Sequence, residues 1–300
     1  VDNDIEKIIT LNKRAEELNM DGVRVLERNE ILSFEPSCKF QSALYVPQAG
    51  VVDYKVVSEM IAKKFLSLGG TIKYFQKIKT INTENNLKVL TSDKETFKSE
   101  FLINCAGLFS DTVAELDNIK PDLRIIPFRG EYYVLSQEKA YLVNNMIYPI
   151  SDPNLPFLGI HLTKTVDGQI EAGPNAVLAF AKEGYKWSNI NVSEFMKTIS
   201  YKGMWKLGKQ YLGTGVSEMY RSLNKRVFLK EILNYIPDVR LSDLKPRVAG
   251  VRAQAVSSNG DLIDDFVFAD GNNSLHVLNA PSPAATASLA IGEYIAAKVS

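Results

Sequence analysis

Several features that mark particular protein classes are missing from this sequence of 300 residues. Basic and acidic residues are equal in number, 35 of each, so the basic excess typical of nucleic-acid-binding proteins is absent. No apolar run approaches the roughly 18 residues that a membrane-spanning helix needs. There is also no signal-peptide pattern of a basic start followed by an apolar core. We therefore expect a cytoplasmic globular protein that does not bind nucleic acid.

Cysteine and histidine are rare, with only two residues of each type. Cys38 and Cys105 lie far apart and match no metal or redox spacing, which favours reduced thiols over a disulfide. The histidines are His161 and His276, too few for a multi-histidine metal site. The sequence therefore predicts no metal site.

The glycine-rich fingerprint of dinucleotide-binding folds is missing as well. The one G-x-G motif, Gly213-Thr214-Gly215, follows a helical pattern and lacks the third glycine. The chain begins at Val1 rather than Met, and residues 2–19 already have a helical pattern. We expect such a chain to be a fragment of a longer protein.

The sequence does contain two α/β segments that flank an antiparallel insertion. Residues 53–68 have a helical apolar period, and the apolar run 101–105 is typical of a strand buried on both faces. From residue 121 onward, aromatic strand-like stretches alternate with turns. We predict an α/β fold in which 51–120 and 245–300 form one domain. Residues 20–50 and 121–244 form a second domain, and 1–19 are a helix that leads in.

The closing segment His276–Ala290 has the pattern of a short strand, a break with two prolines and a small-residue helix. The free N–H groups of a first helical turn can bind an anion, and small side chains allow a flat ligand close to the backbone. A helix packed tightly against a sheet explains the same pattern. Spacing alone favours packing.

Five further segments contain candidate site residues. The strand end Asn104-Cys105-Ala106-Gly107 allows close approach of a ligand, or is a plain turn. Arg252, after Ala-Gly-Val, suits a carboxylate or a structural ion pair. Alternation places His161 on the polar face of a strand, as a proton acceptor or a surface residue. Arg129 and Arg221 are cations beside aromatic residues, with a solvated strand edge as the simpler reading for Arg129.

Taken together, these segments resemble the L-2-hydroxyglutarate oxidase/dehydrogenase group of FAD-dependent oxidoreductases, within the D-amino-acid-oxidase-like superfamily. The resemblance runs from about residue 23 to the end. The matching stretches are 50–54, 104–107, 127–133, 156–163, 171–177, 249–254 and 276–288.

The resemblance implies an incomplete FAD-binding Rossmann-like domain (51–120 and 245–300) with an inserted, mostly antiparallel α+β substrate domain. FAD would take a hydride from a 2-hydroxy acid, with L-2-hydroxyglutarate becoming 2-oxoglutarate. Arg252 would hold the substrate carboxylate, with Arg129 and His161 facing the flavin–substrate region. The implied cofactor-binding residues are Asn104, Ala106, Gly107, Ala280, Pro281, Ser282, Ala284 and Ala285.

One departure from the family pattern limits these expectations. The family opens with a strand, a glycine-rich loop and a helix that bind the FAD pyrophosphate, and this sequence lacks them. We expect FAD in the full-length protein, but weak or absent FAD binding and no activity in this chain alone. Two alternatives stay open: an amino-acid or amine oxidase or glycerol-phosphate-type dehydrogenase of the same superfamily, and a non-catalytic binding protein. The electron acceptor and peripheral membrane association are also left open.

Overall fold

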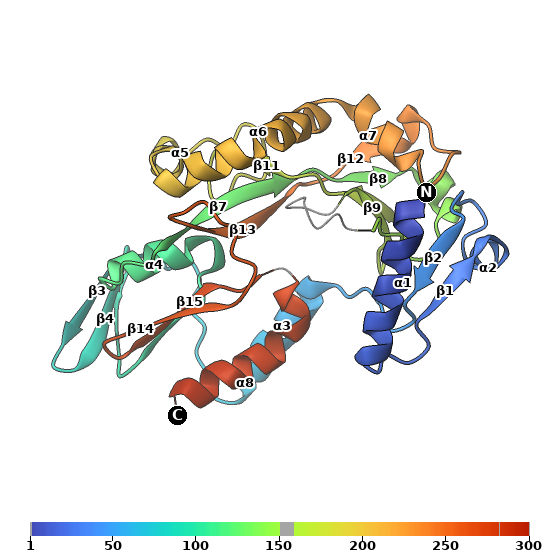
Figure 1. The fold of residues 1–300 in the computed structure, drawn as a ribbon. Helices are drawn as coiled ribbons and strands as arrows, with labels where there is room; N and C mark the ends of the chain where they lie inside the picture. The colour runs from blue at the N-terminus through green and yellow to red at the C-terminus, as the bar shows by residue number, and fades with distance from the viewer. Residues whose placement is uncertain (1, 151–158, 282, 300) are drawn as a thin grey trace. The chain divides into compact units, whose positions relative to one another are not determined.

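The computed structural model describes residues 2–150, 159–281 and 283–299 (Figure 1). Contacts between Cα atoms divide the chain into two compact units. Unit 1 contains Val1–Asp53, Gly130–Val177 and Thr214–Gly250. Unit 2 contains Tyr54–Arg129, Leu178–Gly213 and Val251–Ser300. The two units differ in their bounds from the domains expected from the sequence, because residues 121–129 and 178–213 group with the α/β segments.

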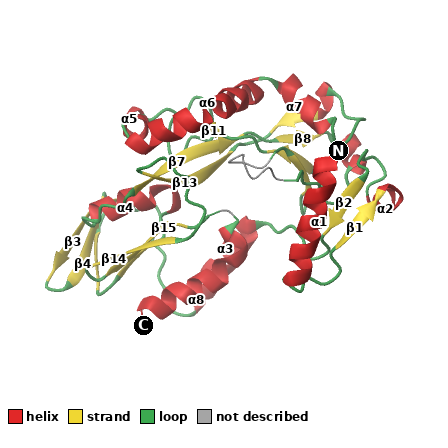
Figure 2. Cartoon of the chain, in the orientation of Figure 1, coloured by secondary structure: helices red, strands yellow, loops and turns green. Residues whose placement is uncertain are grey.

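Unit 1 is built on a four-stranded antiparallel sheet in the order β12-β8-β10-β9. Figure 2 draws the strands in yellow and labels β8. These strands are β8 (Tyr133–Leu135), β9 (His161–Lys164), β10 (Ile170–Gly173) and β12 (Leu244–Pro246), with η2 (Gln137–Leu142), α7 (Lys225–Ile232) and η3 (Leu241–Asp243) beside them in the chain. A hairpin-like pair, β1 (Arg24–Glu27) and β2 (Ser42–Tyr45), accompanies α1 (Asp2–Glu17) and α2 (Arg28–Phe34).

The core of unit 1 joins this sheet to α7 and α2. Leu162 and Ile170 on the sheet are fully buried, as is Ile232 on α7, and Ile31 of α2 belongs to the same cluster. The sheet therefore has one apolar face, as an antiparallel sheet in a soluble fold usually does.

Unit 2 contains three sheets of three strands each. The first is the meander β3 (Ile78–Glu84), β4 (Leu87–Ser92) and β5 (Thr96–Ser99). The second has the order β14-β15-β6, from β6 (Leu102–Asn104), β14 (Val267–Gly271) and β15 (Ser274–Asn279). The third has the order β11-β7-β13, from β7 (Leu123–Gly130), β11 (Val177–Leu178) and β13 (Gly250–Ser257).

Helices cover both faces of β15, all six of whose residues are buried. Leu275 and Val277 pack against Ile295 of α8 (Ser288–Val299). On the other face, Leu278 packs with Ala114 of α4 (Ser110–Leu116). This arrangement is typical of strands in α/β sheets. The remaining helices of unit 2 are α3 (Tyr54–Ser67), η1 (Gly107–Phe109), α5 (Val192–Ile199), η4 (Ala284–Ala287) and the first part of α6 (Lys202–Leu223).

Several elements differ from their predicted form. Among the described residues β6 pairs with β15 alone, and Ile103 is 42% exposed, so the apolar run 101–105 is not buried on both faces in this structure. The helical pattern of α3 is confirmed, yet none of its residues is buried. The closing α-helix begins at Ser288, because the 3₁₀ turn η4 precedes it. In α6, Tyr211 has non-helical backbone angles and kinks the helix.

Candidate functional site

Two neighbouring parallel strands of unit 2 end beside each other. In the pair β6–β15, Asn104 lies opposite His276. The chain leaves β6 through Ala106 and Gly107, and leaves β15 through Ala280 and Pro281. Ligands of open α/β sheets bind outside the carboxyl ends of parallel strands. The topology therefore brings together the two predicted cofactor-binding segments at one sheet edge.

The side chain of Asn104 shapes the first of these segments. Its Oδ1 accepts a hydrogen bond from the Ala106 amide at 3.1 Å, and its Nδ2 donates to the Ser110 carbonyl at 2.8 Å. The same Nδ2 lies 3.0 Å from Nδ1 of His276. Asn104 is 3% exposed, so these contacts are buried. Its amide thus holds the turn that follows β6 rather than pointing to solvent.

His276 continues this network into the protein. Because Asn104 donates to Nδ1, that nitrogen is the acceptor and Nε2 carries the proton of a neutral ring. Nε2 lies 3.1 Å from Oδ2 of Asp117, which also accepts from Ser274 Oγ at 2.6 Å. Oδ1 of Asp117 accepts from Nζ of Lys88 at 2.5 Å. The sequence signalled His276 only as a structural residue, and the network agrees.

The pKa of Asp117 reflects this environment. Burial raises the pKa of the carboxyl, but hydrogen bonds from Lys88, Ser274 and His276 outweigh burial and hold it below its usual value. Lys88 is 2% exposed and His276 is fully buried. The result is a satisfied polar cluster beneath the sheet edge, with a carboxylate at its centre.

Gly107 and the closing segment leave backbone accessible at the same edge. Ala106 and Gly107 are exposed, and Gly107 has φ +54° with no atom within 4 Å of where a Cβ would stand. Ala280 and Ala285 are exposed, and Pro281 and Ala284 are half-buried. The Ala284 amide donates to the Pro281 carbonyl at 2.8 Å, so this one amide of the closing segment is engaged within the turn. Ser282 lies outside the described residues.

The two predicted site arginines lie on neighbouring strands. Arg129 is near the end of β7 and Arg252 near the start of β13. Arg129 is 1% exposed, and its guanidinium carbon lies 3.8 Å from the ring centre of Trp187. This corrects the simpler reading of Arg129 as part of a solvated edge. Arg252 is exposed. Sequence reasoning missed Trp187, since no spacing joins it to residue 129.

His161 belongs to unit 1. It lies on β9 between Ile160 and Leu162, which are 2% and 0% exposed, so the predicted alternation is confirmed. Its ring stacks on Tyr148 with the ring centres 4.3 Å apart. Burial lowers the pKa of His161 to about 4, which leaves the ring neutral at pH 7. Its Nδ1 is buried and has no hydrogen-bond partner among the described residues.

Arg221, a weaker candidate from the sequence, forms ion pairs with two carboxylates of its own unit. Its Nη1 lies 2.7 Å from Glu218 Oε1, and its Nε lies 3.0 Å from Glu231 Oε1. Burial raises the pKa of Glu231, Arg221 lowers it and Glu218 raises it. This resolves Arg221 as a structural ion-pair residue.

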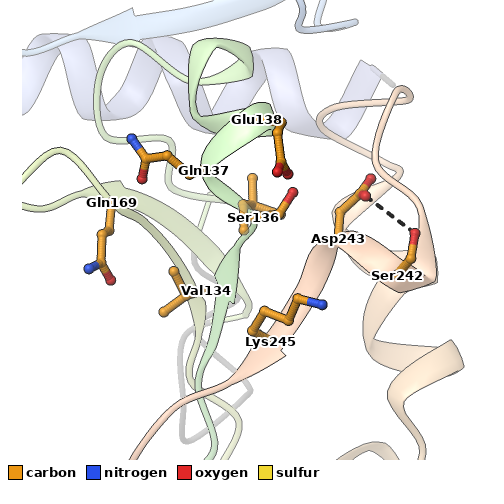
Figure 3. Close-up of a pocket in the computed structure, with 9 residues that line it drawn as sticks. Val134, Ser136, Gln137, Glu138, Gln169, Ser242, Asp243 and Lys245 are labelled. Carbon is orange, nitrogen blue, oxygen red and sulfur yellow. Dashed lines mark hydrogen bonds between the residues drawn. The ribbon is translucent and has the colours of Figure 1, made fainter.

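A polar depression in unit 1 lies apart from the candidate residues. It is lined by residues of β8, η2, η3 and β12, and of the loop before β10 (Figure 3). None of the predicted site residues lines it. Among the described residues, no group of three or more His, Cys, Asp or Glu is arranged to hold a metal ion. None of the described helices is both long and apolar enough to cross a membrane.

Comparison with proteins of known function supplies close relatives. A 47% identical L-2-hydroxyglutarate dehydrogenase from Indibacter alkaliphilus matches 94% of this chain and 71% of its own length. An enzyme of the same name from Escherichia coli is 41% identical over 91% of this chain and 65% of its own. The human mitochondrial enzyme of that name is 37% identical over 99% of this chain and 68% of its own length. This chain therefore spans about two thirds of these relatives.

Solved structures agree on the fold. A dithionite-reduced L-alpha-glycerophosphate oxidase from Mycoplasma pneumoniae, with FAD bound, superposes with a TM-score of 0.72 at 20% identity. The match covers 97% of this chain and 68% of the oxidase chain. A glycine oxidase from Geobacillus kaustophilus gives 0.62 at 12% identity, over 93% and 64%. A family profile described as FAD dependent oxidoreductase matches residues 2–298. The chain is a homologue of L-2-hydroxyglutarate dehydrogenases and belongs to the FAD-dependent oxidoreductase family.

Proposed function

We propose that this chain is the greater part of an enzyme that oxidises L-2-hydroxyglutarate to 2-oxoglutarate. The observation that carries the proposal is the 47% identity to a dehydrogenase of that substrate over 94% of the chain. The matched region covers 94% of the chain, so it extends into both units.

FAD fits the sheet edge of unit 2. Exposed backbone at Ala106 and Gly107 and small residues after β15 leave room for a flat ligand at the ends of two parallel strands. We assign the cofactor to unit 2, as an incomplete Rossmann-like domain whose strand β15 has helices on both faces. Ala106, Gly107, Ala280, Pro281, Ala284 and Ala285 would hold the cofactor, with Ser282 proposed from sequence alone. FAD, when bound, accepts a hydride from the carbon that bears the substrate hydroxyl.

The arginines have distinct roles in this proposal. The exposed guanidinium of Arg252 binds a substrate carboxylate through a bidentate contact. The guanidinium of Arg129 is buried against the ring of Trp187. In this proposal its positive charge faces the flavin–substrate region. His161 lies in unit 1, the substrate domain in this proposal, and its ring is neutral at pH 7. A role for it toward the hydroxyl proton is proposed from the resemblance alone.

The test uses the protein expressed from its own gene, with any residues encoded beyond these 300, and loaded with FAD. Anaerobic addition of L-2-hydroxyglutarate should bleach the flavin absorbance. The D enantiomer, glycerol 3-phosphate and amino acids should leave the absorbance unchanged. Bleaching by one of these alone, without bleaching by L-2-hydroxyglutarate, would reject the substrate assignment.

Arg252 provides the residue-level test. Arg252→Ala should lower kcat/KM about 10- to 100-fold, the value of a charged hydrogen-bonded contact. The matched control is Arg247→Ala, because Arg247 pairs with Glu171 at 2.6 Å on unit 1. Equal losses in the two variants would remove Arg252 from the carboxylate site.

A further inference from the structure

The outer surface of α5 and the start of α6 combines exposed apolar side chains with lysines. Ile190, Val192, Met196 and Trp205 are 62%, 69%, 53% and 65% exposed. Four exposed lysines stand among them: Lys186, Lys197, Lys202 and Lys209. We call these eight residues the α5–α6 surface.

Both helices are amphipathic, so the exposure is built into the sequence. On α5, Phe195 faces inward and meets Phe180 edge-on with ring centres 5.4 Å apart, while Val192 and Met196 share the outer face. On α6, Leu207 and Met204 pack with Ile126 and Val256 of the sheet. Asn191 caps α5 by accepting from the Glu194 amide at 3.2 Å. The outer residues are therefore held in place by a packed inner face.

Trp205 is the most informative member. Its indole Nε1 donates to the Ile199 carbonyl at 2.7 Å, which ties α6 to the end of α5. The polar atom of the ring is thus satisfied inside the protein, and the exposed part of the side chain is apolar. An exposed indole of this kind suits a boundary between water and a less polar phase.

The segment that forms this surface is rich in lysine although the formal net charge of the whole chain is zero. Between residues 185 and 209 the sequence has five lysines and a single acid, Glu194. Glu194 is engaged, because its carboxylate accepts from the Lys182 amide at 2.8 Å. Lys206 donates to Asn259 at 3.1 Å and is not counted in the surface. The formal net charge of the chain is zero, so the basic surface is local.

We propose that the α5–α6 surface docks on an anionic lipid bilayer. Lysines are depleted from protein–protein interfaces, whereas amphipathic helices with lysines around Trp, Met and aliphatic residues are typical of membrane surfaces. Anionic headgroups would neutralise the four lysines, and the apolar side chains would enter the boundary between headgroups and acyl chains. The proposal concerns surface attachment only and does not depend on the substrate.

The test is co-sedimentation of the chain with vesicles of phosphatidylcholine alone and with added phosphatidylglycerol. Binding should require the anionic lipid and should weaken at high salt. Lys197→Glu/Lys202→Glu/Lys209→Glu should weaken partitioning at least about tenfold, since each basic residue near an anionic surface contributes. The matched control is Lys63→Glu/Lys77→Glu/Lys98→Glu, which makes the same charge change at exposed positions elsewhere in unit 2.

Fluorescence gives a second readout, since the chain has only two tryptophans. In a Trp187→Phe background, Trp205 emission should shift to the blue with anionic vesicles and should be quenched by brominated lipids. Circular dichroism and melting curves establish that each variant is folded. The proposal is overturned by equal binding to neutral vesicles, by equal losses in the two triple variants, or by unchanged Trp205 emission in bound protein. Self-association through these lysines without lipid would equally reject it.

Discussion

Asn104 shows how a single residue orients a turn and a neighbouring ring. Both hydrogens of its Nδ2 are used, one for the Ser110 carbonyl and one for Nδ1 of His276. Its Oδ1 receives the Ala106 amide. The amide orientation and the histidine tautomer therefore depend on each other. If the proposed FAD site is correct, this pair positions the exposed backbone at Ala106 and Gly107.

Asn104→Asp should reveal this dependence. The carboxylate keeps the acceptor for Ala106 but loses both donors, and we expect a loss of about 2–4 kcal/mol in the free energy of unfolding at pH 8. Urea unfolding of the variant and of the unchanged chain at pH 8 measures the loss.

Asn279→Asp is the control for that experiment. Asn279 is 4% exposed, and its Nδ2 donates to the carbonyls of Ile263 and Asp265 at 3.1 and 2.8 Å. The variant loses two buried donors without a histidine partner. No loss in the Asn104 variant beside a clear loss in the Asn279 variant would contradict the proposed role of Asn104.

His161 predicts a separate effect of pH on stability. Its pKa is about 4 when folded and about 6.5 in an unfolded chain, so the unfolded state binds the proton first. Stability is therefore lost as pH falls from about 6.5 toward 4. In His161→Gln the free energy of unfolding should fall by about 1–2 kcal/mol less over this pH range. The value is kept small because the ring is partly exposed. The measurement is urea unfolding at pH 7 and pH 4.5, and parallel losses in both proteins would contradict it.

At the scale of elements, the sequence predicted where a helix or strand forms better than it predicted which of its side chains are buried. The period of α3 defined its bounds almost to the residue, yet the side chains on its apolar face are exposed, such as Met60 at 57%. The small-residue pattern did not show that Ala284–Ala287 form a 3₁₀ turn before the closing helix, because alanines suit a 3₁₀ turn as well as an α-helix. The apolar run at 101–105 could not reveal that β6 is an edge strand, since strand order depends on residues far apart in the chain.

In the candidate site, some residues were predictable from their own segments, but the contacts between them were not. Asn104 and His276 stood out within their own segments, but their contact joins residues 172 positions apart. Lys88 and Asp117 had no local signal at all, because an ion pair between a strand and the residue after a helix leaves no spacing pattern. Trp187 likewise meets Arg129 only through the fold.

Two glycines of α6 test how this helix is seated. A Cβ at Gly203 would collide with the Ser257 carbonyl of β13, whereas a Cβ at Gly208 would meet nothing within 4 Å. Gly203→Ala should therefore cost about 1–3 kcal/mol through overpacking. Gly208→Ala should gain up to about 1 kcal/mol from helix propensity. Melting temperatures of the two variants should move in opposite directions, and a shared direction would contradict this seating.

For the whole molecule, the clearest expectation concerns cofactor retention. The sequence lacks the glycine-rich loop that holds the FAD pyrophosphate, so the 300 residues alone should bind FAD weakly or not at all. Titration with FAD, followed by flavin fluorescence, measures this affinity. A yellow purified chain with one flavin per molecule would contradict the expectation, while leaving the proposed substrate to its own test.

The edge position of β6 bears on how the protein behaves in the test tube. Among the described residues its hydrogen-bonded neighbour in the sheet is β15, which makes β6 an edge strand in these 300 residues taken alone. An open edge with an exposed apolar residue is a template for a strand from another molecule. Ile103→Lys places a charge there without disturbing the core, and should reduce aggregation in light scattering at high concentration. Ile103, which the sequence pattern places in a buried strand, is thus a position at which the solubility of the chain can be changed.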